Sequence, residues 1–155
     1  MAVNNVTRFL DSRKVPYTVF ELPREKLGGE EVARLLNALP EIVFKSIVIL
    51  RKGSGKPVLA VVPVNQEVDL KKLAKTVGEK KVSPATQREA ENITKLQAGG
   101  ISPLALINQG FEIVIHRSVL KFEKVHISGG ELGVNIRLSS SDLIDLTRAK
   151  VADIS

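Results

Sequence analysis

The chain has 155 residues, 43% of them apolar, and we expect residues 1–155 to form a single domain with one sizeable core. It contains no cysteine, which excludes disulfides, a cysteine nucleophile and thiolate metal ligands. Lys and Arg number 23 against 17 Asp and Glu, and this net charge of +6 favours a polyanion such as RNA as partner, with ordinary solubility as the alternative.

Targeting and metal signals are missing from the sequence. No apolar stretch is long enough to cross a bilayer, and Met1–Asn5 carries no basic segment ahead of an apolar one. We therefore expect no membrane partner and a cytoplasmic location. The only histidines, His116 and His126, lie in apolar β-like runs, so we expect structural roles for them rather than general-base roles. We expect no metal ion and no other cofactor.

The apolar periodicity of the first half predicts helices mixed with strands. The expected elements are a helix capped by Asn4–Asn5 and ended by Pro16, a strand at Tyr17–Leu22, a helix at Glu30–Leu39, and strands at Ile42–Leu50 and Val58–Val64. Between the last two strands, Gly53-Ser54-Gly55 is typical of a hairpin turn.

The second half continues the mixture. The expected elements are a helix from the N-cap Asp69 to Gly78, a helix opened by Ser83-Pro84 and ending near Asn92, strands at Phe111–His116, Lys124–Ser128 and Val134–Leu138, and a final helix at Asp142–Lys150 with Ser139 as its N-cap. Hairpins combined with single helices favour a mixed α/β sheet domain over a helical bundle.

Lysines stand out in two places. Lys45 lies in the apolar run Ile42–Leu50, so it either extends along apolar surface to solvent or points into a polar cleft. In a cleft its charge would suit a phosphate or a developing negative charge. The other lysines are Lys71, Lys72, Lys75, Lys80 and Lys81, which form either a solvated helix face or an RNA-binding surface.

Two glycine-rich loops follow, at 98–104 and 127–133. Paired glycines let backbone N–H groups approach a ligand closely, and Ser102-Pro103 stiffens the exit of the first loop. Taken alone, each loop is more typical of a structural turn, and neither has the spacing of a P-loop or a dinucleotide-binding motif.

Four blocks, taken together and in order, resemble the YbaK family, the prolyl-tRNA-synthetase-associated or INS-like editing domains. They are Val43-Phe44-Lys45-Ser46, Val68-Asp69-Leu70-Lys71-Lys72-Leu73-Ala74, Gly99-Gly100-Ile101-Ser102-Pro103-Leu104 and Ile127-Ser128-Gly129-Gly130. The resemblance implies an α/β fold whose mixed, strongly curved and partly barrel-like sheet is flanked by helices.

The resemblance also implies a trans-editing activity. This is hydrolysis of the ester of a mischarged tRNA, most typically cysteinyl- or alanyl-tRNA for proline, with the tRNA acceptor end as partner and prolyl-tRNA synthetase as a candidate partner. It assigns Lys45, Gly100 and Ser128 to catalysis. It assigns substrate binding to Phe44, Ser46, Gly99, Ile101, Ser102, Pro103, Gly129, Gly130 and Asn135.

The chain departs from the family pattern at Leu22, Glu131 and Asn135, so the resemblance does not carry over an amino-acid preference. Two alternatives remain open. One is a non-catalytic module that binds the tRNA acceptor end or a synthetase, and the other is a small-molecule binder that uses the same glycine-lined cleft.

Overall fold

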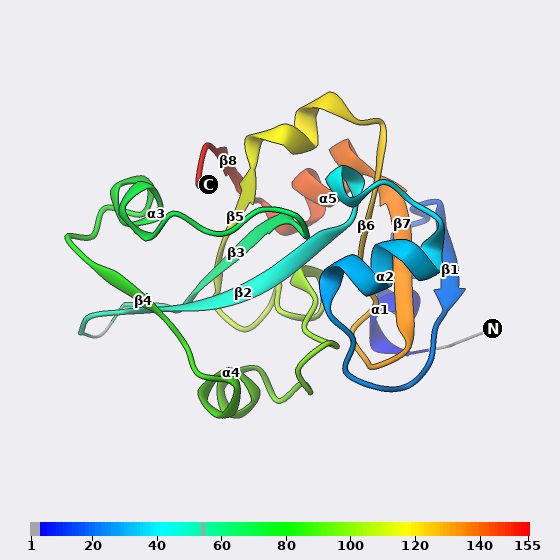
Figure 1. Cartoon of the computed structure of the whole chain (residues 1–155), viewed down its shortest axis with the longest axis horizontal. Coiled ribbons are helices and arrows are strands. Elements are labelled where there is room, and N and C mark those ends of the chain that lie inside the picture. Colours follow the sequence, from blue (N-terminus) through cyan, green and yellow to red (C-terminus); the bar gives the residue numbers. More distant parts are fainter. Residues whose placement is uncertain (1–3, 54) are drawn as a thin grey trace.

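The computed structural model describes residues 4–53 and 55–155 (Figure 1), and these form a mixed α/β fold, as expected. Within them lie the helices α1 (Asn5–Ser12), α2 (Gly29–Leu36), α3 (Leu70–Thr76), α4 (Gln87–Thr94) and α5 (Ser140–Thr147), and the short 3-10 helices η1 (Pro40–Ile42), η2 (Pro103–Ala105) and η3 (Arg117–Lys121). The strands are β1 (Tyr17–Glu21), β2 (Phe44–Arg51), β3 (Val58–Pro63), β4 (Val82–Pro84), β5 (Glu112–His116), β6 (Lys124–Ser128), β7 (Val134–Ser139) and β8 (Lys150–Ala152). No helix in these ranges combines the length and the apolar character that crossing a membrane requires.

The strands form two open sheets. One has the order β1-β7-β6 and is antiparallel, and the other has the mixed order β4-β2-β3-β5-β8. The expectation of one strongly curved, partly barrel-like sheet is therefore wrong. Closure requires pairing around a complete ring, whereas these sheets are joined by a single bridge between Val43 and His126. Alternation in a sequence predicts which side chains share a face but not which edges pair.

The hairpin predicted between β2 and β3 is present. The two strands pair antiparallel from Phe44↔Pro63 to Ile49↔Val58. Ser54 of the predicted turn lies outside the described residues. Every residue of β3 is buried, because this central strand is covered on both faces.

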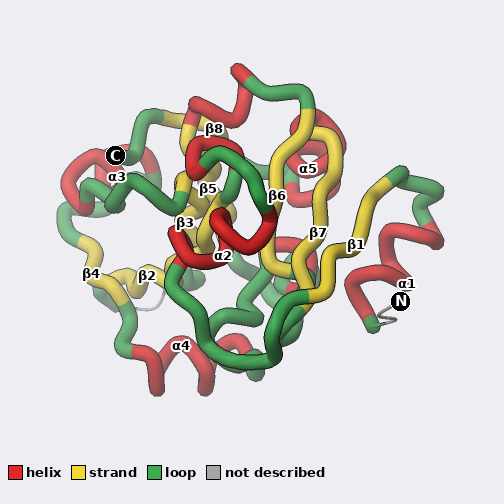
Figure 2. Tube along the Cα trace, turned by 45° about the vertical axis from the view of Figure 1, so that its right-hand side comes forward, coloured by secondary structure: helices red, strands yellow, loops and turns green. Residues whose placement is uncertain are grey.

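The three-stranded sheet has one apolar and one polar face, since successive strand residues point to opposite sides. Val19, Ile127 and Ile136 pack into the main core. On the other face Ser128 and Asn135 are directly paired across β6 and β7. Figures 1 and 2 show that α2 lies over the region where the two sheets meet, on the side of this polar face.

Side-chain caps begin α1 and α3 where the sequence predicts them. Asn4 accepts a hydrogen bond from the Thr7 amide at 2.9 Å, and Asp69 accepts from the Lys71 and Lys72 amides at 3.0 Å. Each of these caps satisfies backbone donors that have no partner within the helix.

The helix predicted to open at Ser83-Pro84 begins later. Ser83 and Pro84 belong to β4, where Pro84 pairs with Ile49, and α4 starts after the N-cap Thr86. A proline is tolerated at the first position of a helix and equally on an edge strand such as β4. The local sequence therefore did not separate the two possibilities.

The last helix is shorter than predicted. It ends at Thr147 because Arg148 adopts the left-handed conformation with φ of 52°. Lys150, expected to be helical, instead begins β8 and pairs with Val114 of β5. This strand is only three residues long, too short for an alternating apolar pattern to predict it, and it is stabilised by its pairing with the buried strand β5.

Candidate functional site

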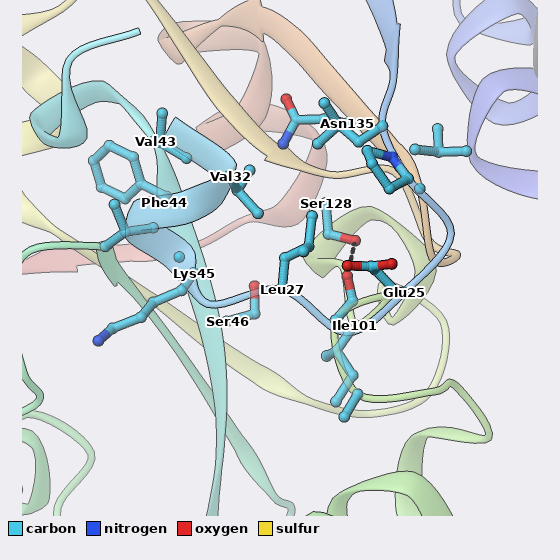
Figure 3. A pocket seen from close by; sticks show the side chains of 18 residues that line it. Glu25, Leu27, Val32, Val43, Phe44, Lys45, Ser46, Ile101, Ser128 and Asn135 are labelled. Carbon is cyan, nitrogen blue, oxygen red and sulfur yellow. Dashed lines mark hydrogen bonds between the residues drawn. The ribbon is translucent and has the colours of Figure 1, made fainter. Parts of the chain in front are cut away.

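A cavity of about 260 Å³ lies between the two sheets. Its walls come from the segment 22–29, α2, the start of β2, Val64 just after β3, the loop 98–101, and the adjoining ends of β6 and β7 (Figure 3). Most lining side chains are apolar, with a few polar groups among them, which is the usual composition of a small-ligand site.

The cavity gathers residues from three of the four sequence blocks. Lys45, Gly99 and Ser128 all line it, so the expected convergence of the lysine and the two glycine loops is present. The other predicted site residues on its walls are Phe44, Ser46, Ile101 and Asn135. Five further residues predicted for the site are not among the residues that line the cavity: Gly100, Ser102, Pro103, Gly129 and Gly130.

Lys45 lies at the rim of the cavity. It is the second residue of β2 and pairs with Val62 in β3, so its backbone is held by a central part of the sheet. Its side chain is only 24% exposed, and its Nζ lies 3.1 Å from Glu67 Oε1. In Figure 3 its ammonium is directed away from Ser128 and Asn135. The lysine thus supplies a fixed positive charge at one end of an apolar cavity.

Ser128 connects the two glycine loops. Its Oγ donates to the Gly99 carbonyl at 3.3 Å, drawn as the dashed line in Figure 3, and accepts from the Gly130 amide at 3.4 Å. The hydroxyl is therefore held in place by one group from each loop.

Gly100 is needed where the two loops touch. A Cβ on it would lie 2.9 Å from Glu131 Cα and 3.0 Å from the Glu131 carbonyl carbon. Both are backbone atoms that cannot rotate away, so only glycine permits this approach. Gly100 is not among the residues that line the cavity, and what the structure shows for it is this close packing of the two loops.

The backbone amides of the loops divide into two groups. The Gly100 amide donates to the Gln97 carbonyl and the Gly129 amide to the Val134 carbonyl, both at 2.8 Å. Gly99 and Ile101 line the cavity, and their amides donate to no acceptor in the described ranges. Gly133 of the second loop also lines the cavity, and its amide likewise donates to no acceptor in those ranges, so each loop brings an unbonded amide to the lining residues.

Ser102 and Pro103 directly follow the cavity-lining part of the first loop. Ser102 is fully buried, and its Oγ accepts from the Leu104 amide at 3.3 Å. Pro103 begins η2 and is also buried. Both residues are therefore packed into the protein interior at the exit of the loop.

Both histidines are buried and hydrogen bonded, which confirms the structural interpretation. His126 Nδ1 lies 2.9 Å from Asn135 Oδ1, and His116 Nε2 lies 2.8 Å from Ser155 Oγ. Burial is the main cause that lowers the pKa of each imidazole. The contact from His126 also fixes the orientation of the Asn135 amide at the cavity wall.

The predicted RNA-binding lysines lie apart from the cavity. We call Lys71, Lys72, Lys75, Lys80 and Lys81 the lysine surface; all five are exposed, on α3 and the turn after it, and none lines the cavity. Lys72 Nζ bonds to Asp153 Oδ2 at 3.2 Å and to the Ser155 carbonyl at 2.8 Å. Four of the five lysines have no ion-pair partner in the part of the chain that the structure describes.

Sequence reasoning missed two carboxylates, Glu25 at the cavity and Glu67 beside Lys45. Both lie in irregular segments with no apolar periodicity, so no local signal marks them. In residues 4–53 and 55–155, no three acidic or histidine side chains lie close enough together to bind a metal ion.

A family model and two similar proteins all relate this chain to the editing of aminoacyl-tRNA. The model of the aminoacyl-tRNA editing domain family matches residues 26–146. A candidate Cys-tRNA(Pro)/Cys-tRNA(Cys) deacylase, EbsC of Enterococcus faecalis, is 34% identical over 153 residues, which are 97% of this chain and 92% of that protein. The prolyl-tRNA editing protein ProX of Acetoanaerobium sticklandii is 26% identical over 144 residues, 90% of this chain and 87% of that protein.

A solved structure shares the fold. The crystal structure of a candidate trans-editing enzyme for prolyl-tRNA synthetase superposes with a TM-score of 0.80 at 24% identity, covering 99% of both chains. The family match spans most of the sequence and includes the lysine and both glycine loops. The chain therefore belongs to the aminoacyl-tRNA editing domain family.

Proposed function

We propose that the chain is a trans-editing deacylase that hydrolyses the ester between a mischarged amino acid and the 3′-terminal ribose of tRNA. The observation that carries the proposal is the meeting of Lys45, the free amides of Gly99 and Ile101, and Ser128 around one small cavity. Family membership and the names of the two sequence relatives support the same reaction.

The chemistry needs little beyond positioning and charge stabilisation, because an aminoacyl ester is already activated. A water oxygen attacks the ester carbonyl carbon, and the Gly99 and Ile101 amides donate to the carbonyl oxygen as it becomes negative. The ester C–O bond then breaks, and the ribose oxygen takes up a proton. The neighbouring ribose hydroxyl, or the thiol of a cysteinyl substrate, is suited to assist the proton transfer.

Lys45 has a binding role in this scheme. A lysine ammonium is a compact charge with three donors, suited to a phosphate of the acceptor end. Because the stem is held by β2 and the head is at the rim, the phosphate would bind outside while the aminoacyl group enters. Phe44 and Ser46 flank it on the wall and would contact the aminoacyl group.

The substrate that we propose is tRNA for proline charged with a small amino acid, cysteine or alanine, which is supported by the family resemblance and by the names of the two relatives, a candidate Cys-tRNA(Pro)/Cys-tRNA(Cys) deacylase and a prolyl-tRNA editing protein. A pocket gains only about 1–3 kcal/mol per methylene, so side-chain selection is modest. We therefore expect the tRNA itself, and prolyl-tRNA synthetase as a partner, to contribute to selection.

The decisive experiment is a panel of tRNAs for proline and alanine, each charged with cysteine, alanine or serine. Release of the amino acid is measured with and without the protein. We expect accelerated release from cysteinyl- or alanyl-tRNA for proline. Binding that slows release would support instead a non-catalytic acceptor-end binding module.

Lys45→Ala should lower the rate of amino-acid release from the charged tRNA by about 10²-fold, which is the effect of losing one charge-stabilising interaction. Lys52→Ala is the matched control, because Lys52 is exposed and lies outside the cavity. Thermal unfolding of both variants shows whether the fold is retained. Full activity of a folded Lys45→Ala protein would exclude the proposed site.

A further inference from the structure

The cavity carries opposite charges on opposite sides. Among its lining residues, all of them in the described ranges, Glu25 is the one acid and Lys45 the one cation. Figure 3 shows the Glu25 carboxylate on the side of Ser128 and the Lys45 ammonium on the other side. This polarity would orient a ligand that carries both charges.

The two charged groups differ in their partners. Lys45 is paired with Glu67, whereas Glu25 has no ion-pair partner in residues 4–53 and 55–155. The wall near Glu25 offers further acceptors, the Gly99 carbonyl and Ser128 Oγ. Each of these oxygens has lone pairs left over after their mutual hydrogen bond. An ammonium group has three donors and no acceptor, so it matches such a set.

The backbone around Glu25 is held against the second glycine loop. The Glu25 amide donates to the Pro23 carbonyl at 2.9 Å, and the Leu22 amide donates to the Gly133 carbonyl at 2.8 Å. A Cβ on Gly133 would lie 2.8 Å from both the Leu22 carbonyl oxygen and Arg24 Cγ. The segment that carries Glu25 is thus closely packed onto the loop that follows Ser128.

We infer that Glu25 binds the α-ammonium group of the aminoacyl substrate and makes a free amine a requirement for hydrolysis. This inference rests on the proposed deacylase function. With the ammonium at Glu25, Ser128 and the Gly99 carbonyl, the tRNA phosphates lie toward Lys45 and the ester lies between the two charges. An N-acylated substrate has a neutral amide with one donor, so it leaves the carboxylate without its counter-ion.

The consequence is a distinction between two classes of charged tRNA. Aminoacyl-tRNA carries a free ammonium, whereas peptidyl-tRNA and other N-acylated forms do not. The enzyme would hydrolyse the former and spare the latter, although the ester bond is the same in both.

The test compares alanyl-tRNA with N-acetylalanyl-tRNA prepared from the same tRNA for proline. We expect the wild-type protein to hydrolyse the free-amine substrate with a kcat/KM at least tenfold higher. Glu25→Gln keeps the size of the side chain and should lower kcat/KM for alanyl-tRNA about tenfold. It should change the rate for N-acetylalanyl-tRNA by less than twofold, so that the preference disappears.

Glu30→Gln is the control, because Glu30 is an exposed carboxylate on α2 that does not line the cavity. It should keep the wild-type preference, and Glu25→Asp should restore part of it. The inference would be overturned if Glu25→Gln lowered kcat/KM equally for alanyl-tRNA and N-acetylalanyl-tRNA, or if it left the preference for alanyl-tRNA unchanged. Equal hydrolysis of both substrates by the wild-type protein would also overturn it while leaving the deacylase function intact. No release from either of them, or from cysteinyl-tRNA for proline and its N-acetylated form, would overturn both.

Discussion

Lys45 and Glu67 form an ion pair at the rim of the cavity, with 3.1 Å between Nζ and Oε1. The lysine side chain is 24% exposed and the glutamate side chain 92%, so the pair joins a largely buried cation to a solvated anion. Such pairs contribute at most about 1 kcal/mol, and an incoming phosphate can replace the carboxylate at little cost. Glu67 therefore competes with the polyanion for Lys45.

Glu67→Gln should strengthen tRNA binding by up to about fivefold at low salt, because the competing carboxylate is removed. The change should shrink as salt rises and screens the charges. Binding of uncharged tRNA to the wild-type protein and to Glu67→Gln at two salt concentrations measures the effect. Glu123→Gln, an exposed carboxylate away from the cavity, controls for the change in net charge. Weaker binding by Glu67→Gln would show that the carboxylate assists the ligand.

Gly100→Ala should damage both stability and activity. The new Cβ meets the Glu131 backbone at 2.9 Å, so the two glycine loops must move apart. Overpacking of this kind costs about 1–3 kcal/mol of unfolding free energy. Since the free amides of Gly99 and Ile101 belong to one of these loops, deacylation should also fall.

Gly28→Ala is the comparison, because a Cβ there meets nothing within 4 Å and the backbone has an ordinary φ of −67°. Gly28 is the N-cap of α2, where alanine costs about 0.5–1 kcal/mol, so the wild-type protein serves as a second reference. Urea unfolding and deacylation are measured for both variants. A Gly100→Ala protein as stable and active as Gly28→Ala would mean that the loops adjust freely.

Local signals predicted most of the fold. Asp69 caps α3 as expected, because capping depends on a few neighbouring residues. The prediction of a helix start at Pro84 was wrong, because proline suits both the first turn of a helix and an edge strand. Lys150 could not be assigned to β8, since that strand exists through its pairing with Val114. The two separate sheets likewise depend on pairings between distant segments.

The candidate site shows the same division. The resemblance identified Lys45, Gly99 and Ser128, which the cavity brings together. It did not identify Glu25 or Glu67. Both lie in irregular segments, and only the fold places Glu25 at the cavity and Glu67 beside Lys45. A pattern of residue types also could not show that the Gly100 and Gly129 amides are already bonded within the protein.

The lysine surface gives a prediction about salt dependence. Changing its four unpaired lysines to glutamine should lower tRNA affinity and reduce the slope of log Kd against log salt by about 0.7–0.9 for each tRNA phosphate that the variant no longer neutralises. The catalytic step, measured at saturating protein, should change little because these residues lie outside the cavity. The residues changed are Lys71, Lys75, Lys80 and Lys81. A variant with Lys52, Lys56, Lys121 and Lys124 changed to glutamine has the same net charge, and an equal effect there would indicate nonspecific attraction.

Stability should decrease as the pH falls below about 6.5, the pKa of an unperturbed histidine. Burial lowers the pKa of His126 in the folded state, the contact with Asn135 opposes that shift, and Arg137 adds to it. Above pH 6.5 the imidazole is neutral in both states and the full stability is present. As the pH falls toward the lower folded pKa, the unfolded chain binds the proton first, so the folded state loses stability.

Urea unfolding between pH 8 and 5.5 measures this loss, in a range above the ordinary pKa values of Asp and Glu side chains. His126→Gln should be less stable at pH 8, since the contact with Asn135 changes, but its unfolding free energy should depend less on pH. His116, whose pKa burial also lowers, supplies the dependence that remains. A His126→Gln protein with the full wild-type pH dependence would show that His126 binds a proton equally well in both states. The loss would then belong to His116 alone.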